Sequence, residues 1–141
     1  MSHAWMLLAA ATTIVAGPPG MDEGQVTYLK DAKWVAASTP GIPAGVWLSP
    51  VAGDAKTGPS VAYAKFAAGF VFPAHWHSHA ESIVFLSGKG HMVIDGKDHD
   101  LIPGTYLVVP AKATHQLSCG SEGECVILSR RAGPTDYHFV K

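Results

Sequence analysis

The chain has 141 residues, a length that suits one domain with a modest hydrophobic core. Its 10 basic and 11 acidic side chains give a formal net charge of −1 without a block of like charge, which argues against a nucleic-acid partner or an acidic membrane surface. Charged residues make up only 15%, whereas 15 glycines and 10 prolines favour many short strands and tight turns over long helices.

Residues 1–20 have the pattern of a cleavable secretory signal peptide. An apolar, uncharged run from Ala4 to Ala16 is followed by G-P-P-G. The run is shorter than the roughly 20 residues of a membrane span, but it suits the hydrophobic region of a signal, with Ala16 at the cleavage point. We expect an exported protein, periplasmic or secreted, with no stable membrane span. Because no Lys or Arg precedes the run, the alternatives are a wrongly assigned start codon and a buried N-terminal helix in a cytoplasmic protein.

Residues 21–59 are predicted to form an irregular N-terminal arm with short strands. The arm is rich in Pro, Gly and small side chains. One strand is expected over residues 25–28 and another over residues 46–50, and the composition of residues 54–59 indicates a turn.

From residue 60 to residue 131, short apolar runs follow one another at close and even spacing. Turn residues separate them, and Asp95-Gly96 is the strongest short hairpin signal in the chain. This pattern is typical of an antiparallel sandwich or barrel and not of alternating strands and helices. The expected strands are 61–66, 70–77, 82–87, 91–95, 99–102, 105–110, 115–119 and 125–131.

Three of the eight histidines, His75, His77 and His79, fall within five residues, and Glu81 follows. Side chains at i and i+2 of a strand share a face, so His75 and His77 can hold one ion together. His79 and Glu81 share this parity and compete for the next ligand position, unless a turn at residues 78–80 directs His79 away. A third nitrogen and a carboxylate would make a site for Fe, Mn, Ni, Cu or Zn, and a solvated histidine-rich loop is the alternative.

The spacing of these residues resembles the first motif of the cupin superfamily, G-x5-H-x-H-x3(or 4)-E-x6-G, which residues 69–88 match at every fixed position. Residues 104–119 resemble the second motif, G-x5-P-x-G-x2-H-x3-N. There His115 is retained, whereas Lys112 replaces Gly and Cys119 replaces Asn. These two replacements put the turn after Pro110 in doubt more than the metal.

The resemblance implies a small single-domain cupin of the type-2 conserved barrel. Its fold would be all-β, a double-stranded β-helix or jelly-roll barrel over residues 60–131, with residues 132–141 as a C-terminal tail. It also implies one divalent metal ion of unknown identity, with one or two open positions for water, dioxygen or an oxygen-bearing substrate. The family's ligand set maps by position to His75, His77, Glu81 and His115.

Strand parity with these residues predicts the wall of the site. Ile83, Phe85, Leu117 and Val71 are expected to face the metal and to form a small apolar cavity. His79, where it is not a ligand, is expected beside the site or at the surface. No inward Arg or Lys is evident that could anchor an anionic group, and parity does not decide whether Lys65 or Tyr63 contributes.

Two cysteines, Cys119 and Cys125, flank the turn-like segment G-S-E-G-E. If this segment is a five-residue hairpin loop, the two residues face each other with Cβ atoms about 4–5.5 Å apart, close to the separation in a disulfide. An oxidising compartment would permit the bond. Two free, packed cysteines in a cytosolic protein are the alternative.

The function expected from the resemblance is a metal-dependent enzyme, dioxygenase-like, that acts on a small enolisable or aromatic compound. A divalent ion with one carboxylate ligand would leave the site positive, which favours enolates or carboxylates. A metal-dependent isomerase or epimerase and a non-catalytic small-molecule-binding or sensor protein are the alternatives. A homodimer is expected by analogy with other small cupins.

Overall fold

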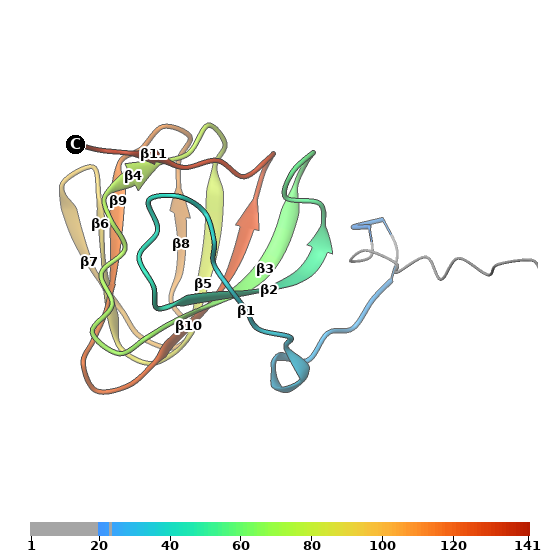
Figure 1. Ribbon diagram of the computed structural model, residues 1–141, viewed down its shortest axis with the longest axis horizontal. Coiled ribbons are helices and arrows are strands. Elements are labelled where there is room, and N and C mark those ends of the chain that lie inside the picture. Colours follow the sequence, from blue (N-terminus) through green and yellow to red (C-terminus); the bar gives the residue numbers. More distant parts are fainter. Residues whose placement is uncertain (1–19, 23) are drawn as a thin grey trace, which may run out of the picture.

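The computed structural model describes residues 20–22 and 24–141 (Figure 1). The predicted signal peptide therefore lies, apart from Gly20, outside the described residues. Among those residues, no helix has both the length and the apolar character needed to cross a membrane. The described helical structure is one short 3-10 turn, η1 (Leu29–Asp31), and the other regular elements are strands.

Two antiparallel sheets face each other and form the expected jelly-roll barrel (Figure 1). The all-β prediction is confirmed. The larger sheet contains, in spatial order, β1 (Val35–Ala36), β2 (Val46–Gly53), β3 (Ser60–Phe66), β10 (Cys125–Arg131), β5 (Glu81–Ser87) and β8 (Tyr106–Val109). The smaller sheet contains β11 (His138–Phe139), β4 (His75–Trp76), β9 (His115–Cys119), β6 (Gly90–Ile94) and β7 (Lys97–Leu101).

Two predicted strands need correction. Residues 25–28 have no regular structure and are exposed, with Val26 at 78% and Tyr28 at 60%, because this segment has no strand to pair with. Residues 70–77 do not form one continuous strand: the segment makes an isolated bridge at Val71, and regular pairing resumes only at β4. By contrast, β2 and β11 extend the two sheets from the segments predicted as arm and tail.

The hairpin between β6 and β7 follows from its two turn residues. Asp95 and Gly96 have φ angles of 46° and 77°, and Ile94 pairs with Lys97 on either side of them. A two-residue turn of this kind requires positive φ at both central positions, which Asp-Gly supplies at little steric cost. The sequence signal at this position is confirmed.

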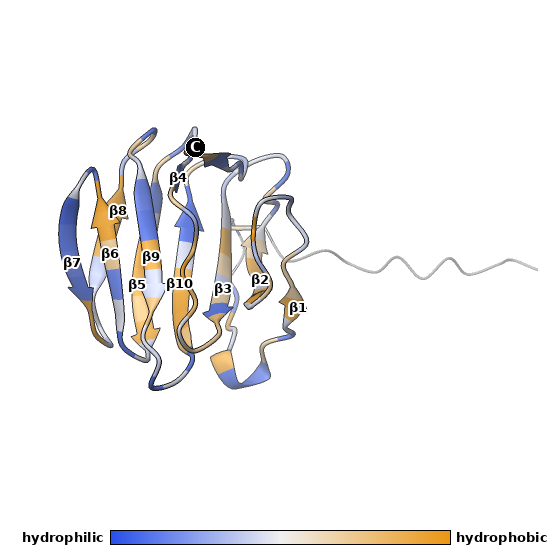
Figure 2. Ribbon diagram, turned by 60° about the vertical axis from the view of Figure 1, so that its left-hand side comes forward, coloured by the Kyte–Doolittle hydropathy of each residue, from blue (hydrophilic) through white to orange (hydrophobic). Residues whose placement is uncertain are grey.

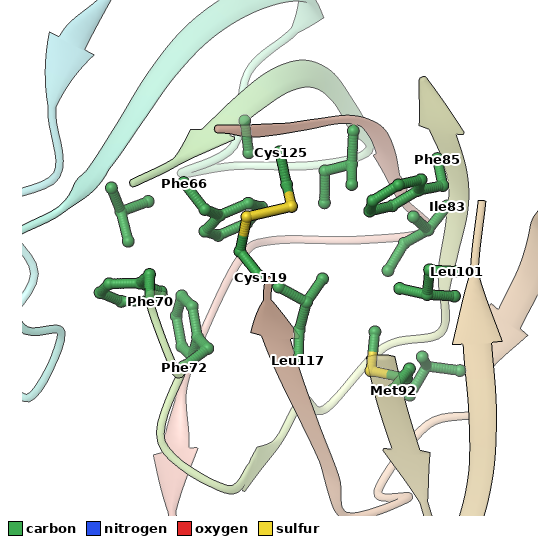
Figure 3. Packing of buried hydrophobic residues seen from close by; sticks show 14 of the residues in the cluster. Phe66, Phe70, Phe72, Ile83, Phe85, Met92, Leu101, Leu117, Cys119 and Cys125 are labelled. Atoms are coloured by element: carbon green, nitrogen blue, oxygen red, sulfur yellow. A yellow bond between two sulfur atoms is a disulfide. The ribbon is translucent and has the colours of Figure 1, made fainter. Parts of the chain in front are cut away.

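Side chains from both sheets fill the space between them (Figure 3). Phe85 is completely buried and Met92 is 1% exposed. Burial alternates along β5 and β9, as expected for strands with one face in the core. The edge strand β7 is hydrophilic, whereas β5 and β10 in the larger sheet are mostly hydrophobic (Figure 2).

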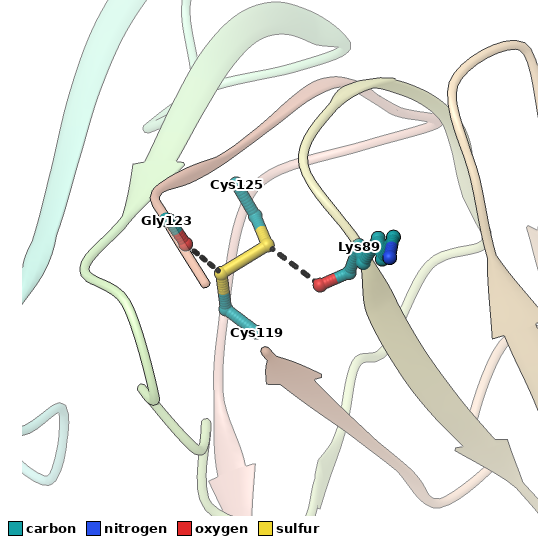
Figure 4. The surroundings of a disulfide bond; sticks show 4 residues. All are labelled: Lys89, Cys119, Gly123 and Cys125. Atoms are coloured by element: carbon teal, nitrogen blue, oxygen red, sulfur yellow. Dashed lines mark hydrogen bonds between the residues drawn. A yellow bond between two sulfur atoms is a disulfide. The ribbon is translucent and has the colours of Figure 1, made fainter. Parts of the chain in front are cut away.

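A disulfide between Cys119 and Cys125 closes the loop that joins β9 to β10 (Figure 4). Their Cα atoms are 5.8 Å apart, and the two sulfur atoms lie 3.3 and 3.2 Å from the carbonyl oxygens of Gly123 and Lys89. Cys119 is the last residue of β9 and His115 is the first. The cross-link therefore lies at the opposite end of this strand from the histidine.

Candidate metal centre

Three buried histidines converge at one end of the smaller sheet. His75 begins β4, His77 follows that strand directly, and His115 begins β9. The sheet places His75 directly opposite His115. One ring nitrogen from each residue lies within 4.8 Å of the other two, and the residues are only 2–4% exposed. The barrel thus brings together residues that are nearly forty positions apart in the chain.

The hydrogen bonds of the three rings determine where their protons lie. Each Nδ1 atom is 2.5–3.0 Å from a backbone carbonyl oxygen. A carbonyl can only accept, so Nδ1 donates its proton, and in the neutral ring Nε2 is left with a free lone pair. Such bonds are typical of metal-binding histidines because they orient the ring. The carbonyls of Pro73, Asp136 and Ala113 serve His75, His77 and His115, respectively.

Burial favours the neutral form of two of these rings, His75 and His115. It lowers the pKa of His75 from 6.5 to about 3, with the neighbouring His115 adding to the effect. Burial likewise lowers the pKa of His115. The Nε2 atom of His77 is buried and has no hydrogen-bond partner in the described part of the chain. Lone pairs that face one another with no donor between them are stabilised by a cation. The residues present therefore fit a divalent metal ion.

Glu81, the first residue of β5, brings a carboxylate to the same place. Its Oε2 atom lies 3.4 Å from Nε2 of His77 and 3.7 Å from Nε2 of His115. Burial raises the pKa of this carboxyl, but the Arg131 guanidinium and the hydrogen bond from the Ser129 hydroxyl outweigh that effect and hold the pKa well below its usual range. Glu81 is thus ionised, which adds to the need for a cation beside the histidines.

The structure adds Arg131 to the site. Its Nε atom lies 3.1 Å from Oε1 of Glu81, to which Ser129 also donates a hydrogen bond. The expectation that no Arg faces inward is wrong. Strand alternation could have predicted this position. Cys125, Ile127 and Ser129 in β10 are buried, and Arg131 is the next residue on the same face of the strand.

The C-terminal segment orients His77. The backbone carbonyl oxygen of Asp136 accepts a hydrogen bond from Nδ1 of His77. The side-chain carboxylate of Asp136 accepts a hydrogen bond from the backbone N–H of Ser78 at 2.9 Å. The ring of His138 stacks on Trp76 with centroids 3.8 Å apart, and β11 pairs with β4. Figure 1 shows this segment along the edge of the barrel that carries β4. No sequence motif pointed to these contacts, which join residues about sixty positions apart.

Lys112 occupies the position of the missing motif glycine. Its φ of 65° lies in the left-handed region that glycine favours, so the turn keeps its shape at a cost of about 1 kcal/mol. Its backbone N–H donates to the carbonyl oxygen of His77 at 2.8 Å. The turn before His115 is therefore tied to the first histidine segment despite the replacement.

A cavity of about 120 Å³ adjoins the three-histidine cluster. Two residues predicted by parity, Ile83 and Leu117, line it, whereas Phe85 is buried in the core beyond the lining. At the end beside the histidines it is lined by Glu81, Arg131, Ser129 and Tyr137. The lining also includes the hydroxyl side chains of Ser60 and Thr135.

Two predicted positions lie outside the cavity. Val71 is 51% exposed, because the segment before β4 is not a regular strand and parity with His75 does not hold across it. The side chain of His79 is exposed and is not part of the histidine cluster, since strand pairing ends at Trp76 and the chain bends before β5.

The family of the chain follows from comparison with known proteins. The model of the Cupin domain family matches residues 62–129, which include the three histidines and Glu81. Residues 62–129 therefore form a cupin domain. Arg131 and the C-terminal segment that orients His77 lie beyond the matched residues.

Individual proteins resemble the chain in sequence or in fold. Dimethylsulfoniopropionate lyase DddW of Ruegeria pomeroyi is 35% identical over 60 residues, which are 43% of this chain and 40% of that protein. The matched part of this chain therefore spans less than half of the length of that lyase. The polyketide cyclase RemF from Streptomyces resistomycificus superposes with a TM-score of 0.71 at 18% identity, over 84% of this chain and 87% of that one. A cupin-2 domain protein from Rhodospirillum rubrum gives a TM-score of 0.67 at 15% identity, over 89% and 84%.

The metal-free cupin will lose stability as the pH falls from about 6.5 toward 3. In this window His75 takes up a proton in the unfolded chain but not in the folded one, so unfolding is favoured at low pH. Between pH 7 and pH 5 this residue alone should cost about 2 kcal/mol. Urea unfolding of chelator-treated protein measures the change. His75→Gln should make the free energy of unfolding less dependent on pH, whereas the exposed control His79→Gln should leave that dependence unchanged. Equal pH dependence in the two variants would show that the lowered pKa of His75 is not its cause.

Asp136→Ala should weaken metal binding by about ten-fold, because the carboxylate anchors Ser78 and so holds the carbonyl that orients His77. Competition of the variant with a chromophoric zinc chelator measures the affinity. Asp100→Ala, which removes an exposed carboxylate on β7, is the matched control and should bind zinc like the wild type. An unchanged affinity of Asp136→Ala would show that the Asp136 carboxylate does not help to position the histidine.

Proposed function

We propose that this cupin is a metal-dependent enzyme that acts on a small oxygen-bearing compound in the cavity beside the histidines. The observation that carries the proposal is the convergence of three buried histidines, each with Nδ1 held by a backbone carbonyl, beside a mostly apolar cavity that His75 and His115 line. His75, His77, His115 and Glu81 would hold the ion. A divalent ion bound there would polarise an oxygen group of the substrate.

Tyr137 is the group proposed to move a proton. It lines the cavity, and its ring centroid lies 5.5 Å from that of His75 and 5.1 Å from that of His77. Burial raises the pKa of the phenol; Arg131 opposes this effect, and Glu81 adds to it. The hydroxyl therefore keeps its proton near neutral pH and can donate it to a group that gains negative charge.

Proton-transfer chemistry, such as that of a lyase or isomerase, is the reaction class we propose first. Two observations support it: the protonated Tyr137 beside the histidines, and the partial identity with a lyase that acts on dimethylsulfoniopropionate. Dioxygenase chemistry on an enolisable or aromatic compound is the second candidate. It is supported by the apolar lining from Ile83, Met92 and Leu117, which would admit dioxygen and exclude water.

We also propose that the cupin acts outside the cytoplasm. The disulfide between Cys119 and Cys125 supports this proposal, since such bonds persist in oxidising compartments. The signal-like pattern of residues 1–20 supports it as well. The homodimer stays a prediction.

Metal content and turnover of natively purified protein test the proposed function. We expect about one divalent ion per chain, and turnover either of dimethylsulfoniopropionate without oxygen uptake or of a diketone or catechol with oxygen uptake. His75→Ala should lose the metal and reduce kcat/KM by at least about a hundred-fold, since it removes the ion that polarises the substrate. His79→Ala, the exposed control, should retain both. A metal-replete protein that turns over none of these compounds would favour a binding or sensor role.

A further inference from the structure

Arg131 carries a polar atom that the metal centre does not use. Its Nε atom pairs with Glu81, whereas Nη1 is buried and has no hydrogen-bond partner among residues 20–22 and 24–141. The side chain is 11% exposed and lines the cavity. Leaving a buried guanidinium N–H without an acceptor destabilises the folded protein, so an acceptor from outside the chain is expected to satisfy it.

We propose that Arg131 and the metal position together bind the carboxylate head of a small monocarboxylate, whose short apolar body fills the rest of the cavity. This inference rests on the proposed function and narrows its substrate class. The flat guanidinium fork suits a carboxylate because it offers parallel N–H donors to the two oxygens. The unpartnered Nη1 supplies a donor in addition to the Nε that holds Glu81.

The charges of the polar end favour one anionic head. The positive charge of Arg131 balances the negative charge of Glu81, and an imidazole that holds a metal through its lone pair carries no charge, so a divalent ion would leave a net charge of about +2. No other Lys or Arg lines the cavity among the described residues. A second anionic group farther from the metal would therefore have no cation to pair with in the cavity. Most dicarboxylates are therefore not expected to bind there.

The far end of the cavity limits the rest of the ligand. It is lined by aliphatic and aromatic side chains, which leave the hydroxyl groups of a sugar without hydrogen-bond partners. The volume of about 120 Å³ is well below the roughly 300–1,000 Å³ of pockets that hold drug-sized ligands. A body of a few carbon atoms is therefore expected. The lining of this end includes Ile42, Val46, Leu48, Phe66 and Met92.

Binding of butyrate to the full chain tests the inference. Calorimetry with zinc-loaded and metal-free protein compares wild type, Arg131→Met, Arg131→Lys and the adjacent control Arg130→Met, whose side chain is exposed on the same strand. Butyramide and glutarate serve as the neutral and dianionic probes. Zinc content is measured for every variant, because Arg131 also contacts the carboxylate of Glu81.

We expect zinc-loaded wild type to bind butyrate at least about ten-fold more tightly than butyramide or glutarate, since only butyrate has a single charged head that pairs with both the ion and Arg131. Arg131→Met should weaken butyrate binding by at least about ten-fold, and Arg131→Lys by less, because lysine keeps the charge but loses the fork. Arg130→Met should bind like the wild type. We expect metal-free wild type to bind butyrate more weakly than the zinc-loaded protein does, and Arg131→Met to weaken that binding further.

Equal butyrate affinity in wild type and Arg131→Met, both loaded with zinc, would overturn the inference and leave the proposed metal enzyme standing. Glutarate that binds as tightly as butyrate would also overturn it. If Arg131→Met fails to fold or to retain zinc, the Arg131→Lys variant decides, and an affinity equal to the wild type counts against the inference. By contrast, wild type that takes up no zinc but binds butyrate through Arg131 would refute the proposed function alone.

Discussion

The site depends on three hydrogen bonds between histidine Nδ1 atoms and backbone carbonyl oxygens. Each bond assigns the proton of a ring to Nδ1 and leaves the Nε2 lone pair free. Because the rings are buried, they cannot relieve the mutual repulsion of these lone pairs by turning into water, and burial lowers the pKa of His75 and of His115, so these two do not take up a proton at neutral pH. With the ionised Glu81 beside them, the rings form a concentration of electron pairs that a divalent cation stabilises.

The barrel supplies the rigidity that these bonds need. His75 and His115 face each other because β4 pairs with β9, and β5 brings Glu81 from the opposite sheet. The C-terminal segment completes the arrangement by presenting the carbonyl of Asp136 to His77. Local sequence alone therefore does not build the site: it forms where both sheets and the last residues of the chain meet.

The sequence predicted the parts of the site that depend on regular spacing. The positions of His75, His77 and His115 follow from strand alternation and from the two family motifs, and the structure brings these three residues together. Parity also placed Ile83 and Leu117 in the cavity wall, because each lies in a regular strand with one buried face.

Other parts could not be predicted in this way. Asp136 reaches His77 from about sixty residues away, and no local pattern encodes such a contact. Val71 faces solvent because the chain before β4 departs from strand geometry, so alternation fails there. Arg131 was open to prediction from the alternation of β10 and shows that a charged residue at the end of a buried face belongs to the site it faces.

X-ray absorption at the metal edge is the decisive measurement for the metal centre, because it counts the ligand atoms around the bound ion. For natively purified protein we expect a divalent metal with three imidazole nitrogens and otherwise oxygen ligands, including Glu81. Fewer than three imidazoles, a sulfur ligand, or protein that binds no divalent ion after exposure to a molar excess would contradict it.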